Sequence, residues 1–564
     1  MNVSVWTWSL FLAAMVCGTT ASQPPILVKG GRVVNSDQIF YGDVLIEDGL
    51  ISGVGSNLQV PEGVRVVDAK NKFVMPGGID PHTHLEMPFM GQEACDDFFS
   101  GQAAALAGGT TMHIDFALPA GESGKSLAAG FEKWKAKAAK SCMDYGFHMA
   151  VTSWSEEVAR DMELLVNEGI NSFKFFLAYK GALMVSDSEF LQGLAQCRKI
   201  GAIAQVHCEN GDAVAEGQTR VFESGVTGPE GHALSRPAVL EGEATARAVR
   251  LAKWINTPLY VVHVMSIDAL EEVSRARLHG QRVVGEPVVS GLALEESRLW
   301  DPDFKVAAQY VMSPPIRSEE HGPALKNALA SGVLQIVATD HAVFNSTQKA
   351  VGKDDFRKIP NGVNGIEERM HVVWEEMVVS GLMSPMEFVR ATSTAAAQVF
   401  NIYPRKGIIA PGSDADIIIL DPSVNACLKV KTFRILDAAE HPQPLCFGPF
   451  GYILTYGYGV KYRFVKQVEH TISASKHHSR MDTNVYEGKI IHGKVVTTIS
   501  RGRIVWENNT LRVEPGTGRF IPMKPFGPLF DGLDDLDKTL FSKFSKYGTT
   551  PVSRSAYETA RDEL

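Results

Sequence analysis

The stretch that decides the fold reads Val-Met-Pro-Gly-Gly-Ile-Asp-Pro-His-Thr-His and runs from Val74 to His84. It is an apolar run that reaches a Gly-Gly turn and then carries two histidines. Side chains two positions apart in a strand point the same way, so His82 and His84 can aim both imidazoles into one space. A His-x-His pair is a weak signal by itself, because two polar loop residues would look the same. It predicts a metal site only if the rest of the chain supplies more ligands.

Length and composition bound the kind of protein. The chain has 564 residues, of which 45% are hydrophobic and 21% are charged, as expected for a folded protein with one large core and a smaller companion domain. Its formal net charge of −9 argues against a nucleic-acid partner, because phosphate binding relies on clustered Lys and Arg. The seven cysteines form no Cys-x-x-Cys pair, which argues against a zinc finger or a thioredoxin-like site.

Both ends of the chain resemble targeting signals. Residues 1–21 hold an apolar stretch followed by small residues, which is typical of a secretory signal peptide and is too short to span a bilayer. The last four residues, Arg561 to Leu564, resemble the Lys-Asp-Glu-Leu retrieval signal of the endoplasmic reticulum. We therefore expect a location in the endoplasmic reticulum lumen and no membrane span. The alternative is a buried N-terminal strand and an incidental acidic tail. Of the two glycosylation sequons, we expect Asn508 rather than Asn345 to be the acceptor.

Two separated segments have the pattern of short strands. β-prone runs alternate with turn pairs over residues 25–75, which predicts a small antiparallel sheet, and the same pattern returns in residues 415–422 and 488–505. We predict one composite β-sandwich domain formed by residues 25–78 and 402–522, because two independent sheets of such short strands would be poorly stable. Residues 523–564 are expected to form a C-terminal tail.

The middle of the chain, residues 79–401, alternates apolar runs with amphipathic or Ala-rich helical stretches. Eight such strand-plus-helix units predict a (β/α)₈ TIM-like barrel, whose parallel strands are buried on both faces. Two further helices, expected over residues 365–379 and 384–400, would close the barrel, and the second begins at a Ser-Pro pair suited to a cap and first turn. The eight expected strands are 73–79, 110–116, 145–151, 172–178, 203–207, 259–265, 282–288 and 334–340.

Polar residues interrupt these apolar runs at comparable places. All but one of them fall at or near a predicted carboxyl end, which is where barrel enzymes place their active sites. Each has a plain structural explanation when taken alone, as a hydrogen-bonded core histidine or a capped aspartate. Together they predict a cage for two metal ions. Its members are His82, His84, Lys174, His207, His263 and Asp340.

Lys174 is the unexpected member of this cage, because an ammonium group repels cations. It becomes a ligand if the neutral amine takes up carbon dioxide and forms an anionic carbamate, and burial among phenylalanines favours the neutral amine. The alternative is a salt bridge between Lys174 and Asp340. Imidazole and carboxylate ligands suit zinc, and water held between two such ions would lose a proton near neutral pH. With Asp340 as general acid and base, the expected chemistry is hydrolysis of an amide or ester.

Four motifs are long enough to compare with known families. They read Asp-Pro-His-Thr-His-Leu-Glu-Met-Pro-Phe-Met-Gly from Asp80, Phe-Lys-Phe-Phe-Leu-Ala-Tyr-Lys-Gly from Phe173, Gly-Pro-Glu-Gly-His-Ala-Leu-Ser-Arg-Pro from Gly228 and Met-Ser-Pro-Pro-Ile-Arg from Met312. These motifs resemble those of dihydropyrimidinases, which share the cyclic-amidohydrolase superfamily with the D-hydantoinases. The resemblance extends from about residue 26 to residue 526.

The resemblance implies a reaction and its residues. The reaction is opening of the cyclic amide of 5,6-dihydrouracil or dihydrothymine to an N-carbamoyl-β-amino acid. The implied cofactors are two zinc ions bridged by carboxylated Lys174, and the implied assembly is a homotetramer. Tyr179 would support the oxyanion, and Ser313 and Asn361 would hold the cyclic imide substrate through backbone groups. The other implied metal ligands are His82, His84, His207, His263 and Asp340.

Two alternatives stay open at this point. Dihydropyrimidinase-related proteins share the expected fold but have lost metal ligands and act as non-enzymatic scaffolds, whereas this chain keeps all six ligand positions. Hydantoinase or allantoinase specificity depends on the shape of pocket loops, which the sequence does not show. A dihydroorotase is disfavoured, because such enzymes place an arginine where this chain has Glu86, whose charge would repel a substrate carboxylate.

Overall fold

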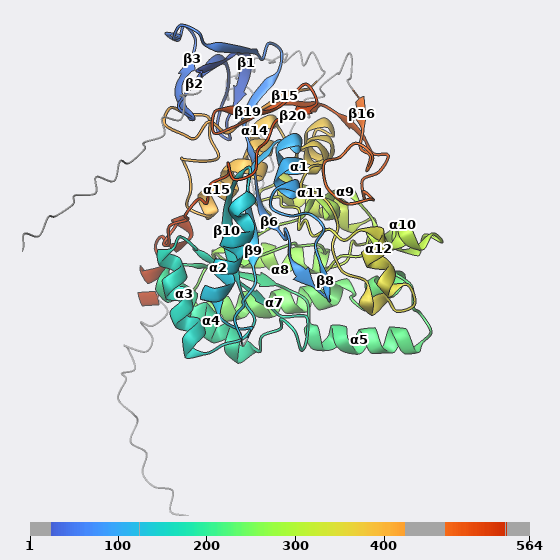
Figure 1. Ribbon diagram of the computed structural model, residues 1–564. Helices are drawn as coiled ribbons and strands as arrows, with labels where there is room; N and C mark the ends of the chain where they lie inside the picture. The colour runs from blue at the N-terminus through green and yellow to red at the C-terminus, as the bar shows by residue number, and fades with distance from the viewer. Residues whose placement is uncertain (1–23, 123, 423–468, 536, 539–564) are drawn as a thin grey trace, which may run out of the picture.

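The computed structural model describes residues 24–122, 124–422, 469–535 and 537–538 of the chain. Two sheets organise these residues: a parallel sheet surrounded by helices, and a mixed sheet built from both ends of the chain. In Figure 1 the mixed sheet lies at the top, where the blue N-terminal strands run beside orange and red strands from the C-terminal part. This arrangement confirms the predicted α/β class with a composite β domain. The predicted signal peptide and the last four residues lie outside the described residues.

The mixed sheet has nine strands in the order β20-β19-β18-β15-β5-β1-β2-β3, with β4 beside β1. The seam between the two ends of the chain is the antiparallel pair β5–β15, in which Ile419 lies opposite Val74. The antiparallel sheet predicted over residues 25–75 is confirmed for β1, β2 and β3, whereas β4 and β5 pair with β1 in parallel. The strands are β1 (Ile26–Val34), β2 (Ile39–Glu47), β3 (Leu50–Gly55), β4 (Arg65–Asp68), β5 (Phe73–Pro76), β15 (Ile417–Asp421), β18 (Lys494–Ser500), β19 (Arg503–Glu507) and β20 (Thr510–Leu511).

The barrel sheet has seven parallel strands in the order β14-β13-β12-β11-β10-β9-β6. Every residue of its five longest strands is buried, as expected for a parallel sheet covered on both faces. No helix among the described residues is long and apolar enough to cross a bilayer. The strands are β6 (Gly78–Thr83), β9 (Thr110–Ala117), β10 (Asp144–Val151), β11 (Ser172–Phe176), β12 (Ile203–His207), β13 (Leu259–Val261) and β14 (Val283–Gly285).

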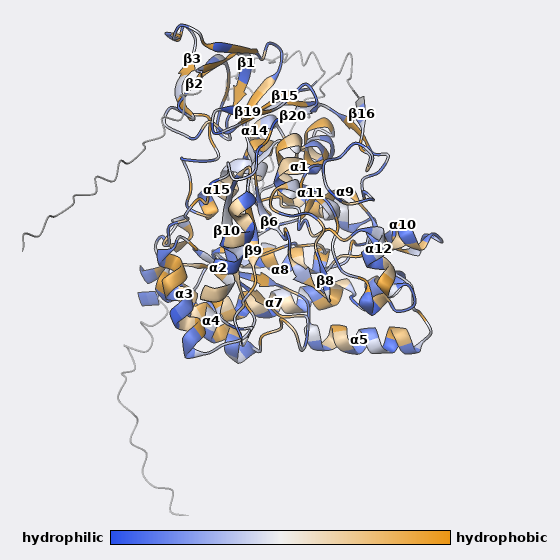
Figure 2. Ribbon diagram, in the orientation of Figure 1, coloured by the Kyte–Doolittle hydropathy of each residue, from blue (hydrophilic) through white to orange (hydrophobic). Residues whose placement is uncertain are grey.

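The helices around the barrel follow their amphipathic patterns. In α3, Val158, Met162 and Leu165 are buried at intervals of four and three, and Figure 2 shows hydrophobic and polar residues alternating along α3, α4 and α5. The helical stretches expected between the apolar runs are confirmed, α4 among them. The barrel helices are α1 (Ser100–Gly108), α2 (Leu127–Lys137), α3 (Glu156–Asn167), α4 (Asp187–Ile200), α5 (Gly211–Glu223), α6 (Glu230–Leu234), α7 (Ala238–Ile255), α8 (Ile267–Leu278), α9 (Val289–Ala293), α10 (Phe304–Gln309), α11 (His321–Ala330) and α12 (Ser346–Lys349).

The closing helices are interrupted. Ser384 caps the second of them, because its side chain accepts a hydrogen bond from the amide of Glu387 and Glu387 returns one, as the Ser-Pro pair predicts. Each expected long helix contains a π-helical turn, so neither is continuous. The segments are α13 (Arg369–Val373), the π turn Trp374–Val379, α14 (Pro385–Val389), the π turn Arg390–Thr394 and α15 (Ala395–Val399).

The first expected barrel strand, residues 73–79, was wrong as a single unit. The chain leaves the mixed sheet at the end of β5 and enters the barrel sheet in β6, with Gly77 between them. A Cβ atom on Gly77 would lie 2.1 Å from the side-chain oxygen of Thr111, and one on Gly78 would lie 2.5 Å from a guanidinium nitrogen of Arg369. The Gly-Gly pair is therefore the crossing point between the two sheets, and His82 lies inside β6 rather than after it.

The expected eighth strand, residues 334–340, was also wrong. Within this segment Ala338 makes an isolated bridge to Val288, and His341, directly after it, makes isolated bridges to Thr83 and Val363. Two of its amides donate elsewhere: Val337 donates to the carbonyl oxygen of Ala391 and Thr339 to the carboxylate of Asp80. The segment still closes the gap between β14 and β6, but without a continuous ladder.

Candidate metal centre and active site

One cavity of about 460 Å³ receives all nine residues predicted for the site. The cavity lies at the ends of β11 and β12. The loops that follow β6 and β13 and the segment that replaces the eighth strand also contribute to its wall. The structure thus brings together side chains that are up to 279 positions apart, from His82 to Asn361. The nine residues are His82, His84, Lys174, Tyr179, His207, His263, Ser313, Asp340 and Asn361.

Three site residues have a left-handed backbone conformation, which residues other than glycine rarely adopt. The φ angles are 64° at Tyr179, 35° at His263 and 53° at Asp340. Such conformations persist only where the surrounding structure enforces them, and they concentrate at functional sites. Each turns the chain sharply beyond a barrel strand or its substitute, which aims the side chain into the cavity.

His82, His84 and Asp340 offer the best-defined metal ligands. The Oδ1 atom of Asp340 lies 3.1 Å from Nε2 of His82 and 3.0 Å from Nε2 of His84. One ligand atom from each residue falls within 4.8 Å of the other two. Two imidazole nitrogens and a carboxylate oxygen are typical ligands of zinc. Among the described residues, Nε2 of His82 and Nδ1 of His84 are buried without an aligned hydrogen-bond partner, so this donor set fits a metal ion.

Electrostatics within this group favour bound cations. The two histidines beside Asp340 hold the pKa of its carboxyl well below its usual range, although burial opposes this shift. Burial lowers the pKa of His84 to about 4, so its imidazole is neutral at physiological pH and keeps a lone pair that can bind a metal ion. The group therefore presents a carboxylate and at least one neutral imidazole to the cavity.

Lys174 lies in the middle of β11 and is 1% exposed. Its ammonium nitrogen is 4.5 Å from the ring centre of Phe116 and 5.2 Å from that of Phe176, and it forms no ion pair within the described part of the chain. The alternative of a salt bridge to Asp340 therefore does not hold in this structure. Burial lowers the pKa of Lys174 to about 8, so an appreciable part of the amine is neutral near physiological pH.

His207 and His263 complete the ring of imidazoles, with their ring centres 4.5 Å apart. Nε2 of His207 lies 2.8 Å from Oε2 of Glu209, and the same carboxylate oxygen accepts a hydrogen bond of 2.8 Å from Arg236. Sequence reasoning missed Glu209 as a site residue and gave Arg236 no role. The signal for Arg236 was its place in the motif that begins at Gly228.

Glu286 is a second residue that sequence reasoning missed. Its Oε1 atom lies 2.7 Å from Nδ1 of His82, and its Oε2 atom accepts a hydrogen bond of 2.5 Å from the hydroxyl of Tyr260. A carboxylate behind a ligating histidine fixes the orientation of the ring and leaves the other nitrogen free for a metal. The available signal was an acidic residue in an apolar run, since Glu286 follows directly after β14.

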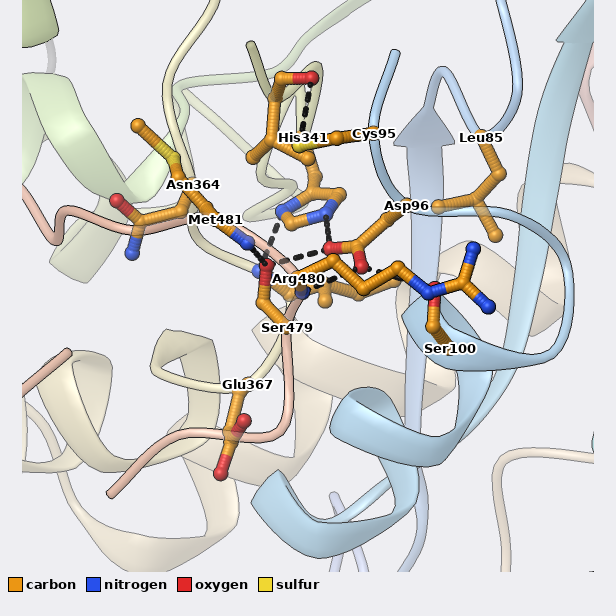
Figure 3. A network of polar contacts seen from close by, with 12 residues as sticks. Leu85, Cys95, Asp96, Ser100, His341, Asn364, Glu367, Ser479, Arg480 and Met481 are labelled. Atoms are coloured by element: carbon orange, nitrogen blue, oxygen red, sulfur yellow. Dashed lines mark hydrogen bonds and ion pairs between the residues drawn. The ribbon is translucent and has the colours of Figure 1, made fainter. Parts of the chain in front are cut away.

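His341, the residue after Asp340, is held in the network of polar contacts drawn in Figure 3. The imidazole of His341 donates from Nε2 to Asp96 over 3.1 Å and accepts at Nδ1 from the amide of Gly365 over 3.2 Å. Asp96 also accepts hydrogen bonds from the hydroxyl of Ser479, at 2.5 Å, and from the amide of Arg480, at 2.8 Å. The segment around residue 480 thus supports the backbone of the candidate acid and base.

Two of the proposed substrate-binding residues, Ser313 and Asn361, are in direct contact in the wall of the cavity. The side-chain nitrogen Nδ2 of Asn361 donates to the hydroxyl of Ser313 over 2.9 Å, and Nε2 of His232 lies 3.1 Å from the same hydroxyl. Burial raises the pKa of Tyr179 to about 12, so its phenol keeps its proton at physiological pH and can donate a hydrogen bond. His232 belongs to the same motif as Arg236 and was likewise given no role from the sequence.

Comparisons with known proteins agree with this geometry. A model described as the amidohydrolase family matches residues 73–446. The chain belongs to the amidohydrolase family. It is 58% identical over 539 residues to a dihydropyrimidinase of Arabidopsis thaliana, covering 95% of this chain and 92% of that protein. It is 46% identical to a dihydropyrimidinase of Dictyostelium discoideum, covering 94% and 96%.

A solved amidohydrolase structure matches the fold as well as the sequence. The crystal structure of a dihydropyrimidinase from Brevibacillus agri superposes with a TM-score of 0.80 at 38% identity, covering 89% of this chain and 99% of that chain. The resemblance stated from the four motifs is therefore confirmed at the level of sequence and fold.

Proposed function

We propose that this amidohydrolase opens the cyclic amide of 5,6-dihydrouracil and dihydrothymine, giving N-carbamoyl-β-amino acids. The observation that carries the proposal is the single cavity that contains all six expected metal ligands together with Tyr179, Ser313 and Asn361. The similarity to dihydropyrimidinases supports the choice of substrate class. In this reaction water adds across the ring C–N bond: the carbonyl carbon gains a hydroxyl group and the leaving nitrogen gains a proton.

The cofactors in this proposal are two zinc ions. His82, His84 and Asp340 would hold one side of the centre, and His207, His263 and a carboxylated Lys174 would supply the remaining ligands. When bound, such ions polarise a carbonyl group and acidify water. The lowered pKa of Lys174 and its lack of an ion pair among the described residues support carboxylation of this amine.

The residues of the chain have separate tasks in the reaction. Asp340, held between two imidazoles, would accept a proton from the attacking water and pass it to the leaving nitrogen. The protonated phenol of Tyr179 would donate a hydrogen bond to the oxygen that becomes negative in the transition state. Backbone groups at Ser313 and Asn361 would meet the in-plane donors and acceptors of the ring imide.

The first experiment compares substrates. We expect kcat/KM for dihydrouracil to exceed the values for hydantoin and allantoin on one preparation. A marked preference for allantoin would refute the assignment, and a preference for hydantoin would move it to the hydantoinase alternative. Metal analysis separates the enzyme from the scaffold alternative, since we expect about two zinc ions per chain for the enzyme and none for a scaffold.

A second experiment tests the lysine bridge. Lys174→Ala is expected to lose zinc and to lose activity by more than about 100-fold, because a ligand shared by both ions is gone. A short carboxylic acid can occupy the space left by the side chain and is expected to restore part of both. Full activity in the variant would show that Lys174 is not a bridge. Lys353→Met is the matched control, since Lys353 is exposed and is not among the residues that line the cavity.

Assembly and location are further parts of the proposal. We propose a homotetramer, which light scattering of the purified chain would test, with a monomer as the contradicting result.

We also propose passage through the endoplasmic reticulum. Asn508 is exposed beside β20, whereas Asn345 is half-buried and caps α12 with its side-chain oxygen. A glycopeptide map is therefore expected to show a glycan on Asn508 and an unmodified Asn345; a glycan on neither would argue against lumenal passage.

A further inference from the structure

Lys349 is a buried lysine that the proposed reaction does not use. It ends the short helix α12 and is 2% exposed. No carboxylate of the described residues pairs with it; its two hydrogen bonds go to main-chain carbonyl oxygens, of Val311 at 3.1 Å and of Gly362 at 2.8 Å. Burying an amine costs free energy that an apolar side chain of the same length would avoid, so packing alone does not account for a lysine here.

The two carbonyl groups belong to the two loops that carry the proposed imide-binding residues. Val311 precedes Ser313 by two positions, and Gly362 directly follows Asn361. The amide of Gly362 also donates to the carbonyl oxygen of Val311 over 2.9 Å, so the amino group of Lys349 reinforces a contact that the loops already make. The Ser313–Asn361 hydrogen bond of 2.9 Å lies on the cavity side of the same junction.

The helix that carries Lys349 is itself fixed. Asn345 and Gln348 exchange hydrogen bonds in a capping box, and the amide of Ser346 donates to Asp482 over 2.8 Å. On the other side, Gly362 packs closely against the segment that carries Asp340: a Cβ atom on Gly362 would lie 2.0 Å from the carbonyl oxygen of Ala342, two residues after Asp340. The lysine therefore connects a rigid helix to loops that face the reacting groups.

From these contacts we infer that Lys349 is a positioning residue, whose amino group sets the spacing of the 311–313 and 361–363 loops through its two hydrogen bonds, so that both sides of the ring imide are met at once. The inference rests on the proposed function for the identity of the substrate. It does not place Lys349 in contact with substrate or metal, because its side chain lies behind the cavity wall.

The test uses Lys349→Met, which keeps the length and volume of the side chain and removes the amine. In the zinc-loaded enzyme we expect KM for dihydrouracil to rise about tenfold with kcat changed by less than about threefold, because the imide contacts act in the ground state and the transition state alike. Zinc content should stay at the wild-type value. Lys353→Met, on the same segment but exposed, should match the wild type.

Two further measurements separate positioning from a merely structural role. A second pocket, of about 290 Å³, is lined by Lys349 and by residues of α10. In Lys349→Ala, a short alkylammonium ion is expected to bind there and to return KM toward the wild-type value. Hydrogen exchange of peptides covering residues 311–313 and 361–363 should be faster in Lys349→Met than in the wild type, without any substrate present.

The outcomes are distinct. An unchanged KM together with unchanged loop exchange in Lys349→Met would overturn the inference. A wild-type enzyme that does not hydrolyse dihydrouracil would refute the proposed function instead, and the exchange measurement would then decide the role of Lys349 alone.

Discussion

Burial lowers the pKa of Lys349 from the 10.5 of a free lysine to about 7, and this has a consequence for stability. Between pH 7 and about pH 10 the unfolded chain keeps the proton that the folded chain has released. The unfolded state therefore binds more protons there, and the free energy of unfolding is expected to rise with pH, by at most about 1.4 kcal/mol per unit from this group. Urea unfolding at pH 7, 8 and 9 would measure the slope.

Comparison with Lys349→Met isolates the contribution of this one amine. In Lys349→Met the free energy of unfolding should rise less steeply with pH than in the wild type, whereas Lys353→Met should keep the wild-type slope. A thiolate at Cys95 would raise the pKa of Lys349, but burial raises the pKa of the Cys95 thiol to about 12, so this group stays uncharged between pH 7 and 9. On the solvent side Lys305 pairs with Asp482 at 3.3 Å. Equal slopes in the wild type and Lys349→Met would contradict the lowered pKa.

Asp96 supports the site through hydrogen bonds rather than through contact with it. As a carboxylate it accepts from His341, Ser100, Ser479 and the amide of Arg480. In Asp96→Asn one acceptor oxygen becomes an NH₂ group that faces other donors. We expect a loss of about 2–3 kcal/mol in the free energy of unfolding, because a buried network is left partly unsatisfied.

Activity of Asp96→Asn should fall by at least about tenfold, since the Asp340 backbone is then held less firmly. Denaturant unfolding and initial rates are the two readouts. Asp354→Asn is a suitable control, because the Asp354 side chain is 86% exposed. Wild-type rates in Asp96→Asn would show that Asp340 keeps its position without this network.

At the scale of elements, strands and helices with regular patterns were predictable and the barrel closure was not. α4 is an example of a predictable helix, because its apolar spacing and its Ser186–Glu189 capping box are both local signals. The replacement of the eighth strand was hidden, since it depends on Asp80 and Ala391 accepting hydrogen bonds from amides far away in sequence. The same holds for the site: strand-end histidines are visible in the sequence, whereas Glu286 and Lys349 acquire roles only through distant partners.

Arg369 supplies hydrogen bonds between β6 and the segment that replaces the eighth strand, where the backbone ladder is missing. The guanidinium group is fully buried and donates to the carbonyl oxygens of Ile79 in β6, at 3.0 Å, and of Val337 in the substitute segment, at 2.8 Å. It also donates to Thr392 in the second π turn, at 3.3 Å. Arg369→Met should therefore lower the free energy of unfolding by about 3–5 kcal/mol, as expected when a buried charged group leaves its partners unpaired.

Thermal and urea unfolding would check this loss, with Arg250→Met as the control, because the Arg250 side chain is 61% exposed on α7. A variant of Arg369 as stable as the wild type would mean that the isolated bridges close the barrel unaided.

At the scale of the whole molecule, the barrel and the mixed sheet meet around one buried lysine. The ammonium group of Lys406 lies 2.7 Å from Asp144, which begins β10, and 2.9 Å from Asp414; it also pairs with Asp416, which precedes β15. The three carboxylates are close enough to hold a cation. Lys406 already supplies the positive charge, and Arg501 adds a second one 2.8 Å from Asp144. This cluster therefore joins the two sheets rather than forming a metal site.

Lys406→Met would leave three buried carboxylates without their central partner. We expect the free energy of unfolding to fall by about 3–5 kcal/mol, and both sheets to unfold in one transition at lower denaturant, because the cluster contacts each of them. At 25 °C the folded fraction should keep its KM, since Asp144 begins its strand at the end of the barrel away from the cavity. Lys29→Met, exposed on β1, should change neither quantity. If instead the mixed sheet alone unfolded early, with the barrel intact and active, the two sheets would be independent folding units despite their shared chain.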